Sequence, residues 1–190
     1  MMIRKRPRGV ATRSLKPSRA LLVAAAGFLV LVLGASAAFA AGPNVGFGFN
    51  ARHVAGFPTG EVFLTGGGAF NSSTGFVHSG GGFTCTSQVN QGPLAGCLTG
   101  QGVRWDTAAL LSGTMFKCTG AVTEALKPAS TDDHTVVLAA DFYRAGDGND
   151  ESFNANMIVS AVDIAPDVPG VQNVWVQGVG CATAVAHFSS

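Results

Sequence analysis

The stretch "TGGGAFNSSTGFVHSGGGF", residues 65–83, carries a glycine triplet on each side of a short polar loop. The two runs that flank the loop, "EVFLTGGGAF" and "FVHSGGGFTC", are typical of the two strands of a β-hairpin. Glycine inside a strand weakens it and marks a sharp bend, a bulge or a close approach to the backbone. The stretch therefore predicts a strongly curved antiparallel sheet.

The register of this hairpin determines which side chains share a face. A loop over Asn71–Gly75 places Phe70 opposite Phe76 and Gly66 opposite Gly80. Because successive side chains alternate between faces, one face then receives Leu64, Gly66, Gly68, Phe70, Phe76, His78, Gly80 and Gly82. We consider two roles for this glycine face: a bend on which a large core side chain such as Trp175 packs, and a flat surface for a ligand.

The rest of the chain beyond residue 43 also predicts strands separated by turns. The clearest runs alternate with period two or are apolar and β-branched, and they cover 44–54, 134–143, 153–164 and 171–188. The segment 103–118 is ambiguous between two short strands and a helical turn at 107–111, and 127–133 predicts a loop. We therefore predict a single all-β domain of about eight strands, an antiparallel barrel or a sandwich.

Residues 1–40 have the layout of a secretory signal peptide. A basic segment at 1–19 precedes an apolar run at 20–37 and the small-residue site Ala38-Phe39-Ala40. We predict cleavage after Ala40, a folded domain over 41–190 and a secreted or cell-surface location. The alternative is an uncleaved membrane anchor, because about twenty apolar residues span a bilayer.

The charges of the chain are divided unevenly between its parts. Seven of the 12 basic residues lie in residues 1–40, whereas all 11 acidic residues lie beyond them. The remaining domain thus carries five scattered basic residues against 11 acidic ones. Such a surface lacks the basic patch that nucleic acid requires, and it gives no reason to expect a membrane as partner once the signal peptide is removed.

Four cysteines lie in the predicted domain, and an even number in an exported chain predicts disulfides. Their spacings contain no C-x-x-C pair of a zinc site. Three connectivities are possible. We prefer Cys85–Cys97, which closes the loop over 86–96, together with Cys118–Cys181, which ties a middle strand to the last one.

Calcium is the one cofactor that the sequence brings into consideration. The segment "DFYRAGDGNDES", 141–152, has the highest density of oxygen ligands, with Asp147, Asn149, Asp150 and Glu151 as the candidates. Its spacing does not match the EF-hand loop. A solvated hairpin turn also explains a cluster of Gly, Asp and Asn.

Motifs for covalent catalysis are not found in the sequence. It contains neither a G-x-S-x-G elbow nor an S-x-x-K motif. The four histidines, His53, His78, His134 and His187, show no i, i+2 or i, i+4 pairing. The sequence therefore favours a non-enzymatic role.

Both ends of the predicted domain resemble a post-COAP-type secreted β domain. The segments are "FGFNARHVAGFPTGEVFL" at 47–64, "GDGNDESFNANMIVS" at 146–160 and "VWVQGVGCATAVAHF" at 174–188. In that family a "FGFNA"-like strand opens the domain, and a "GxxDxF" strand precedes a final glycine-rich strand. The middle of the chain has no counterpart, so the resemblance implies an exported β domain and no particular reaction.

The hairpin at 64–83 is similar to the "GxGxFxxxTGxxxxxGxF" hairpin of allene-oxide-cyclase and dirigent barrels. That similarity implies an eight-stranded barrel that holds an apolar small molecule in its interior. It covers a single hairpin, and no catalytic residue carries over from it.

Two functions follow as hypotheses. The first is an exported, non-enzymatic binding or structural module at or outside the cell surface. The second is a small barrel that binds or isomerises an apolar small molecule in an interior lined by Phe47, Phe49, Phe70, Phe76 and Trp175, with His78 as the polar contact. An enclosed cavity of about 300 Å³ or more is expected for the second, and a filled interior for a structural module.

Overall fold

The computed structural model describes residues 42–144 and 152–190, and the regular elements in this part of the chain are all strands. They are β1 (Val45–Gly56), β2 (Glu61–Asn71), β3 (Phe76–Ser87), β4 (Arg104–Leu111), β5 (Gly113–Phe116), β6 (Lys127–Ser130), β7 (Thr135–Tyr143), β8 (Ser152–Ser160), β9 (Val174–Val176), β10 (Gly180–Ala182) and β11 (Val185–Ser189). The predicted all-β class is confirmed. The helical turn considered at 107–111 is wrong, because these residues belong to β4, and β6 lies where a loop is predicted.

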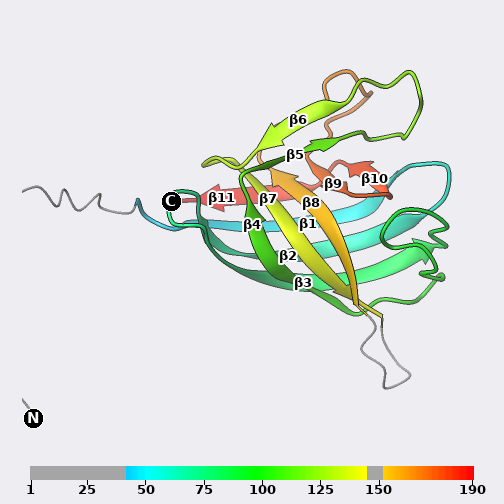
Figure 1. Cartoon of the computed structure of the whole chain (residues 1–190), viewed down its shortest axis with the longest axis horizontal. Helices are drawn as coiled ribbons and strands as arrows, with labels where there is room; N and C mark the ends of the chain where they lie inside the picture. Colours follow the sequence, from blue (N-terminus) through cyan, green and yellow to red (C-terminus); the bar gives the residue numbers. More distant parts are fainter. Residues whose placement is uncertain (1–41, 145–151) are drawn as a thin grey trace, which may run out of the picture. The chain divides into compact units, whose positions relative to one another are not determined.

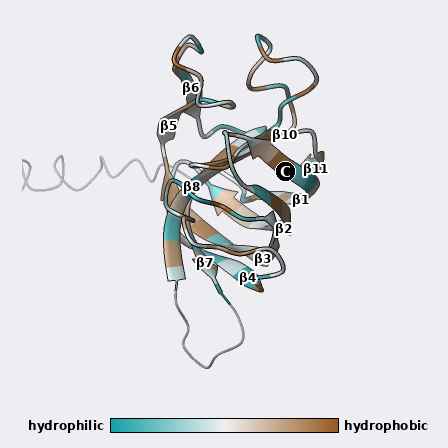
Figure 2. Cartoon of the chain, turned by 90° about the vertical axis from the view of Figure 1, so that its right-hand side faces the viewer, coloured by the Kyte–Doolittle hydropathy of each residue, from teal (hydrophilic) through white to brown (hydrophobic). Residues whose placement is uncertain are grey.

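Eight strands form a closed antiparallel ring. Their order is β10-β9-β8-β7-β4-β3-β2-β1, and β10 also pairs with β1, which joins the two ends of the sheet (Figure 1). β11 extends the ring along the first half of β1, from Gly46 to Asn50. Most neighbours in the ring are also neighbours in sequence, as in an up-and-down barrel. Along the strands, hydrophobic and hydrophilic residues alternate, as expected when one face is buried (Figure 2).

The β2–β3 hairpin differs by one residue from the predicted register. Asn71 pairs with Phe76, so that Phe70 lies opposite Val77 and Gly66 opposite Gly81. The physical reason is the Asn71 side chain, whose Oδ1 accepts hydrogen bonds from the Ser73 and Thr74 backbone N–H groups and closes a four-residue turn. A shift of one residue moves every side chain of the partner strand to the other face.

Consequently both faces of the hairpin carry glycine. Gly66, Gly68 and Gly81 face the interior of the ring, while Gly67, Gly80 and Gly82 face outward. The predicted large side chain on the glycine floor is present, but it is Trp105 and not Trp175. A Cβ on Gly66 would lie 2.5 Å from Trp105 Cζ2, and one on Gly81 would lie 2.8 Å from Trp105 Nε1. The indole N–H donates to the Thr65 carbonyl oxygen at 3.0 Å.

The interior of the ring is filled by side chains. Trp105 is fully buried and tilts against Phe49, with the ring centroids 6.1 Å apart. Further fully buried residues contributed by the strands are Leu64, Phe70, Phe83, Leu138, Phe142 and Met157. Phe83 and Phe142 meet edge to face at 5.2 Å. Aromatic rings thus occupy the space that an interior ligand would need.

A second, smaller core lies outside the ring. Phe116 and Trp175 pack there at 5.7 Å, together with outward residues of β7 and β8 such as Val137 and Ile158. It is covered by the β5–β6 pair, which stands apart from the ring in Figure 1, and by the segment 161–173. We call the β5–β6 pair, the segment 117–126 and the segment 161–173 the outer layer.

Both preferred disulfides are present, Cys85–Cys97 and Cys118–Cys181. The first closes the loop after β3, and the second ties the outer layer to β10. The described residues contain no free cysteine.

Replacing Gly66 by alanine tests the contact between Trp105 and the glycine floor. The new methyl group would meet both the indole and the Gly80 carbonyl oxygen within 2.6 Å, so we expect the free energy of unfolding to fall by about 1 to 3 kcal/mol. Gly48→Ala is the matched control, because its nearest atom is 3.9 Å away. We expect that variant to be neutral or slightly more stable. Equal losses in urea unfolding would contradict the packing role of Gly66.

The two disulfides are expected to contribute unequally to stability. Cys118–Cys181 spans 63 residues and Cys85–Cys97 spans 12. The chain-entropy model therefore makes the double Cys118→Ala, Cys181→Ala variant less stable than the Cys85→Ala, Cys97→Ala variant by about 1.5 kcal/mol. Denaturant unfolding under non-reducing conditions measures the difference, and the reverse order would refute this account.

Candidate functional site

An open groove lies on the outer face of β1, with a volume of about 970 Å³. Four segments supply its lining: β1, the start of the segment 117–126, the segment 161–173, and the chain from β10 to β11. We call it the outer groove, and its residues are Asn50, Arg52, His53, Ala55, Gly56, Cys118, Thr119, Val168, Gln172, Cys181, Ala182, Thr183, Ala184 and Val185.

A break between β10 and β11 creates this groove. β1 pairs with β11 through Gly46–Asn50 and with β10 through Ala55–Gly56; in the described chain, neither strand supplies a partner for the four β1 residues between. The buried side chain of Asn173 holds the break open. Its Nδ2 donates to the Ala184 carbonyl oxygen at 3.1 Å, and its Oδ1 accepts from the Ala184 N–H at 2.7 Å. The Asn173 backbone N–H also donates to the Ala182 carbonyl oxygen at 3.0 Å, so Asn173 binds the chain on both sides of Thr183.

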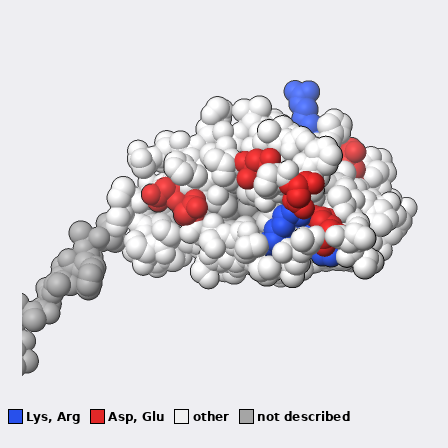
Figure 3. Space-filling view, turned by 90° about the horizontal axis from the view of Figure 1, so that it is seen from above, with Lys and Arg blue, Asp and Glu red and all other residues white. Residues whose placement is uncertain are grey.

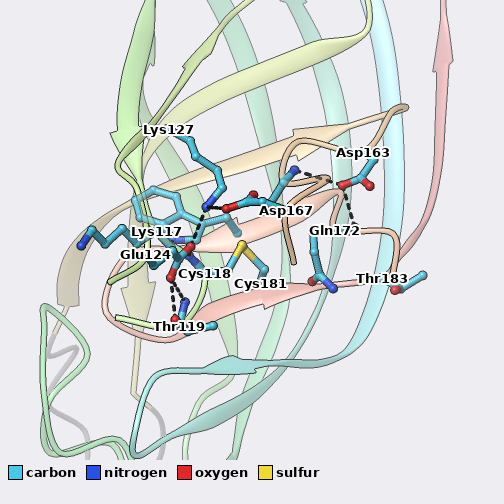
Figure 4. Close-up of a disulfide and its surroundings, with 12 residues drawn as sticks. Lys117, Cys118, Thr119, Glu124, Lys127, Asp163, Asp167, Gln172, Cys181 and Thr183 are labelled. Atoms are coloured by element: carbon cyan, nitrogen blue, oxygen red, sulfur yellow. Dashed lines mark hydrogen bonds and ion pairs between the residues drawn. A yellow bond between two sulfur atoms is a disulfide. The ribbon is translucent and has the colours of Figure 1, made fainter. Parts of the chain in front are cut away.

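The floor of the groove contains the Cys118–Cys181 disulfide, which lies between Thr119 and Gln172 in Figure 4. Gly56 and Gly180 face each other in the seam of the ring beside it, both with positive φ. A Cβ on Gly56 would lie 2.4 Å from the Cys118 carbonyl oxygen, and one on Gly180 would lie 2.8 Å from that same oxygen. Only glycine at these two positions lets the outer layer pass this close to the seam.

A partly buried ion network holds the outer layer together. Lys127 Nζ lies 2.7 Å from Glu124 Oε1 and 2.9 Å from Asp167 Oδ2, so it joins the segments 117–126 and 161–173 (Figure 4). Glu124 also accepts hydrogen bonds from the backbone N–H groups of Cys118 and Thr119, each at 2.7 Å. The two segments that border the outer groove are therefore fixed by charge as well as by the disulfide.

This network shifts the titration of its members. Burial opposes the charged form of Glu124, but the hydrogen bonds from Lys127, Thr119 and the backbone outweigh it and lower the pKa of Glu124 to about 2. Burial likewise opposes the charge of Lys127, yet its contacts with Glu124 and Asp167 prevail and raise its pKa above 10.5. Both groups are therefore charged around neutral pH.

Two adjacent residues of β1, Arg52 and His53, line the groove where the strand bulges. The register shifts between Ala51 and Val54, and both Arg52 and His53 are exposed. His53 Nδ1 lies 3.1 Å from Glu61 Oε1, whose pKa is lowered by hydrogen bonds from Thr86 and His53. The two adjacent polar residues Arg52 and His53 in "NARHV" are the signal in the sequence for this wall, because they break the period-two alternation.

Only some of the residues predicted to line an interior site are brought together. Phe47, Phe49 and Phe70 do meet inside the ring, with Phe47 6.5 Å from Phe49 and 6.0 Å from Phe70. Phe76 is 43% exposed and His78 is exposed, since the observed register turns both outward. The interior placement of these two is wrong.

The interior placement of Trp175 is also wrong. It lies on the outer face of β9, where its indole N–H donates to the Lys117 carbonyl oxygen at 2.8 Å. β9 alternates so that Val174 and Val176 face the ring, which leaves the tryptophan for the second core.

The calcium candidates Asp147, Asn149, Asp150 and Glu151 lie outside the described residues. Within 42–144 and 152–190, no three His, Cys, Asp or Glu side chains gather in a way suited to a metal ion. Seen from above, acidic side chains form small separate groups, some of them next to a basic side chain, and that face shows no continuous basic patch (Figure 3). Those same ranges include no helix with the length and apolar character needed to cross a membrane.

Comparison of the chain with family models, curated proteins and solved structures finds no match in any of the three. The resemblances to a post-COAP-type domain and to allene-oxide-cyclase and dirigent barrels therefore stay predictions. The two disulfides are compatible with an extracellular protein.

The Glu124 network predicts a specific dependence of stability on pH. Because its pKa is about 2 in the folded state and near 4.5 when unfolded, its contribution is complete above pH 4.5 and is lost as the pH falls toward 2. Solvent screening at this partly exposed network makes the expected loss smaller than the roughly 3 kcal/mol that the full difference in pKa would give. We expect Glu124→Gln to lower the free energy of unfolding at pH 7 and to flatten its decline between pH 4.5 and 2.

Asp133→Asn is the control for this measurement, because Asp133 is exposed and the structure records no ion pair for it among the described residues. Urea unfolding at several pH values compares the two variants with the wild-type chain. An unchanged slope in Glu124→Gln would show that the carboxylate is not ionised at low pH.

Proposed function

We propose that the domain beyond residue 40 is exported and acts as a non-enzymatic binding module, with the outer groove as its ligand site. The observation that supports this proposal is that the open space of the domain lies outside the ring and not within it. Aromatic side chains fill the interior of the ring, whereas about 970 Å³ lies open on its outer face. A hollow of this size is in the range of sites for small organic ligands.

The lining of the outer groove suits binding better than catalysis. Apart from Arg52 and His53, its polar side chains are neutral amides and hydroxyls, such as Asn50, Gln172 and Thr183, next to apolar Val168 and Val185. The described lining residues include one histidine and no carboxylate, so they offer no acid–base pair of their own. Export is supported by the signal-peptide pattern at 1–40 and by the two disulfides.

Rigidity of the walls favours the same role. The groove is bordered by the ring, by the Cys118–Cys181 disulfide, which closes a 63-residue loop, and by the segment 161–173. Lys127 ties that segment to Glu124 through its contact with Asp167. Preorganised walls reduce the entropy cost of binding. The interior alternative, a barrel with an enclosed apolar ligand, has no such support from the packed ring.

Blocking the groove tests the proposal. Val185 is 65% exposed and lines the groove, so Val185→Trp should fill part of it without disturbing the core. With the neutral fluorophore Nile red as probe, we expect saturable binding to the mature wild-type domain and a loss of at least tenfold in affinity in this variant.

Val103→Trp is the matched control, because Val103 is 49% exposed and lies away from the groove. It should bind the probe as the wild type does. Binding that survives Val185→Trp unchanged would place the probe elsewhere and overturn the proposal, as would no saturable binding at all.

A further inference from the structure

Among the described residues, the lining of the outer groove holds no acidic side chain, although Glu61, Glu124 and Asp163 hydrogen-bond to residues of the lining. All 11 acidic residues of the chain lie beyond residue 60, yet none of those that the structure describes lines the groove. The lining contributes one arginine, Arg52, and one histidine, His53. In a domain with five basic residues against 11 acidic ones, an arginine in the lining is the local feature that favours an anionic ligand.

Arg52 has no counter-ion in the described part of the chain. Neither an ion pair nor a hydrogen bond joins its side chain to another described residue. Two other cations contrast with it: Arg104 lies 3.4 Å from Asp106 and stacks on Tyr143, and Lys127 contacts two carboxylates. The guanidinium of Arg52 thus keeps its hydrogen-bonding capacity for a molecule in the groove.

The neighbours of Arg52 on β1 also offer hydrogen-bonding groups to an anionic ligand. Asn50 lies two positions earlier on the same outward face of β1 and also lines the groove. His53 uses Nδ1 toward Glu61, which leaves Nε2 for a ligand. The Asn50 amide and the guanidinium are donors to an anion, whereas no described carboxylate in the lining competes with the anion for them.

The number and shape of the charged groups in the lining limit the chemical class of ligand that the outer groove can bind. A single guanidinium matches the single charge and planar fork of a carboxylate, while a phosphate dianion calls for more cations than the lining supplies. The remaining lining is largely apolar, with Val168, Val185 and the disulfide. We infer, building on the proposed function, that the outer groove binds a small organic carboxylate with an apolar body, held at its head by Arg52.

Binding of two matched probes to the mature domain tests this inference. Pyrenebutyrate carries the carboxylate, and its methyl ester has the same apolar body without the charge. We expect the wild-type domain to bind the acid about tenfold or more tightly than the ester, as for a charge-assisted hydrogen bond. Arg52→Gln should reduce that preference to less than threefold and leave the affinity for the ester unchanged.

Arg104→Gln is the control, because it removes an exposed arginine outside the groove and should keep the preference of the wild type. Thermal melting under non-reducing conditions confirms that each variant is folded before its affinity is compared. Loss of the preference in Arg104→Gln as well as in Arg52→Gln would assign it to overall charge and overturn the role of Arg52.

The outcomes separate this inference from the function on which it rests. Equal affinity for acid and ester in the wild type, with both blocked by Val185→Trp, overturns the carboxylate and keeps the groove as the site. A preference that persists in Arg52→Gln overturns Arg52 as the anchor. An acidic peptide that displaces pyrenebutyrate more strongly than small carboxylates do overturns the choice of a small molecule, and no binding of either probe overturns both proposals.

Discussion

The ring depends on one contact, the indole of Trp105 lying directly on the backbone of Gly66 and Gly81. The fully buried indole is wide, and its N–H is satisfied by the Thr65 carbonyl oxygen on the same strand as Gly66. Any side chain at either glycine would occupy the space of the indole or of the neighbouring backbone. Because β2 and β3 can bend around this one large residue, eight short and medium strands close into a ring with a filled interior.

Because the interior of the ring is filled, the proposed ligand site lies on the outside of the ring. There the structure combines three features that each need a particular residue. Asn173 breaks the strand between β10 and β11, Gly56 and Gly180 let the outer layer approach the seam, and the Cys118–Cys181 bond fixes it there. Together they produce a hollow on a surface that would otherwise be a continuous sheet.

The outer layer also shows how a small acidic domain uses its few cations. Lys127 has a structural role, because it forms ion pairs with Glu124 and Asp167 at the border of the groove. Glu124 in turn satisfies two backbone N–H groups next to Cys118. An unpaired buried carboxylate would be strongly destabilising, so this network is both the support of the groove and the reason its walls remain close to the disulfide. Arg52 differs because it faces the groove with no such structural partner among the described residues.

The sequence by itself determined the all-β class, the number of strands in the ring to within one or two, and the presence of two disulfides, because period-two alternation, turn residues and the parity of cysteines act locally or by simple counting. Counting left three connectivities open, of which the preferred one is present. A large side chain on the glycine floor was one of two roles that the sequence offered, and only the tertiary structure decided that Trp105 takes it, since Trp175 lies on the face of β9 that the ring does not enclose. The same holds for Phe76 and His78: the side chain of Asn71 closes the turn one residue earlier than expected, and a one-residue slip exchanges inside and outside. The outer groove could not be predicted from local sequence patterns, because its walls come from four segments that meet only when β10 pairs with β1.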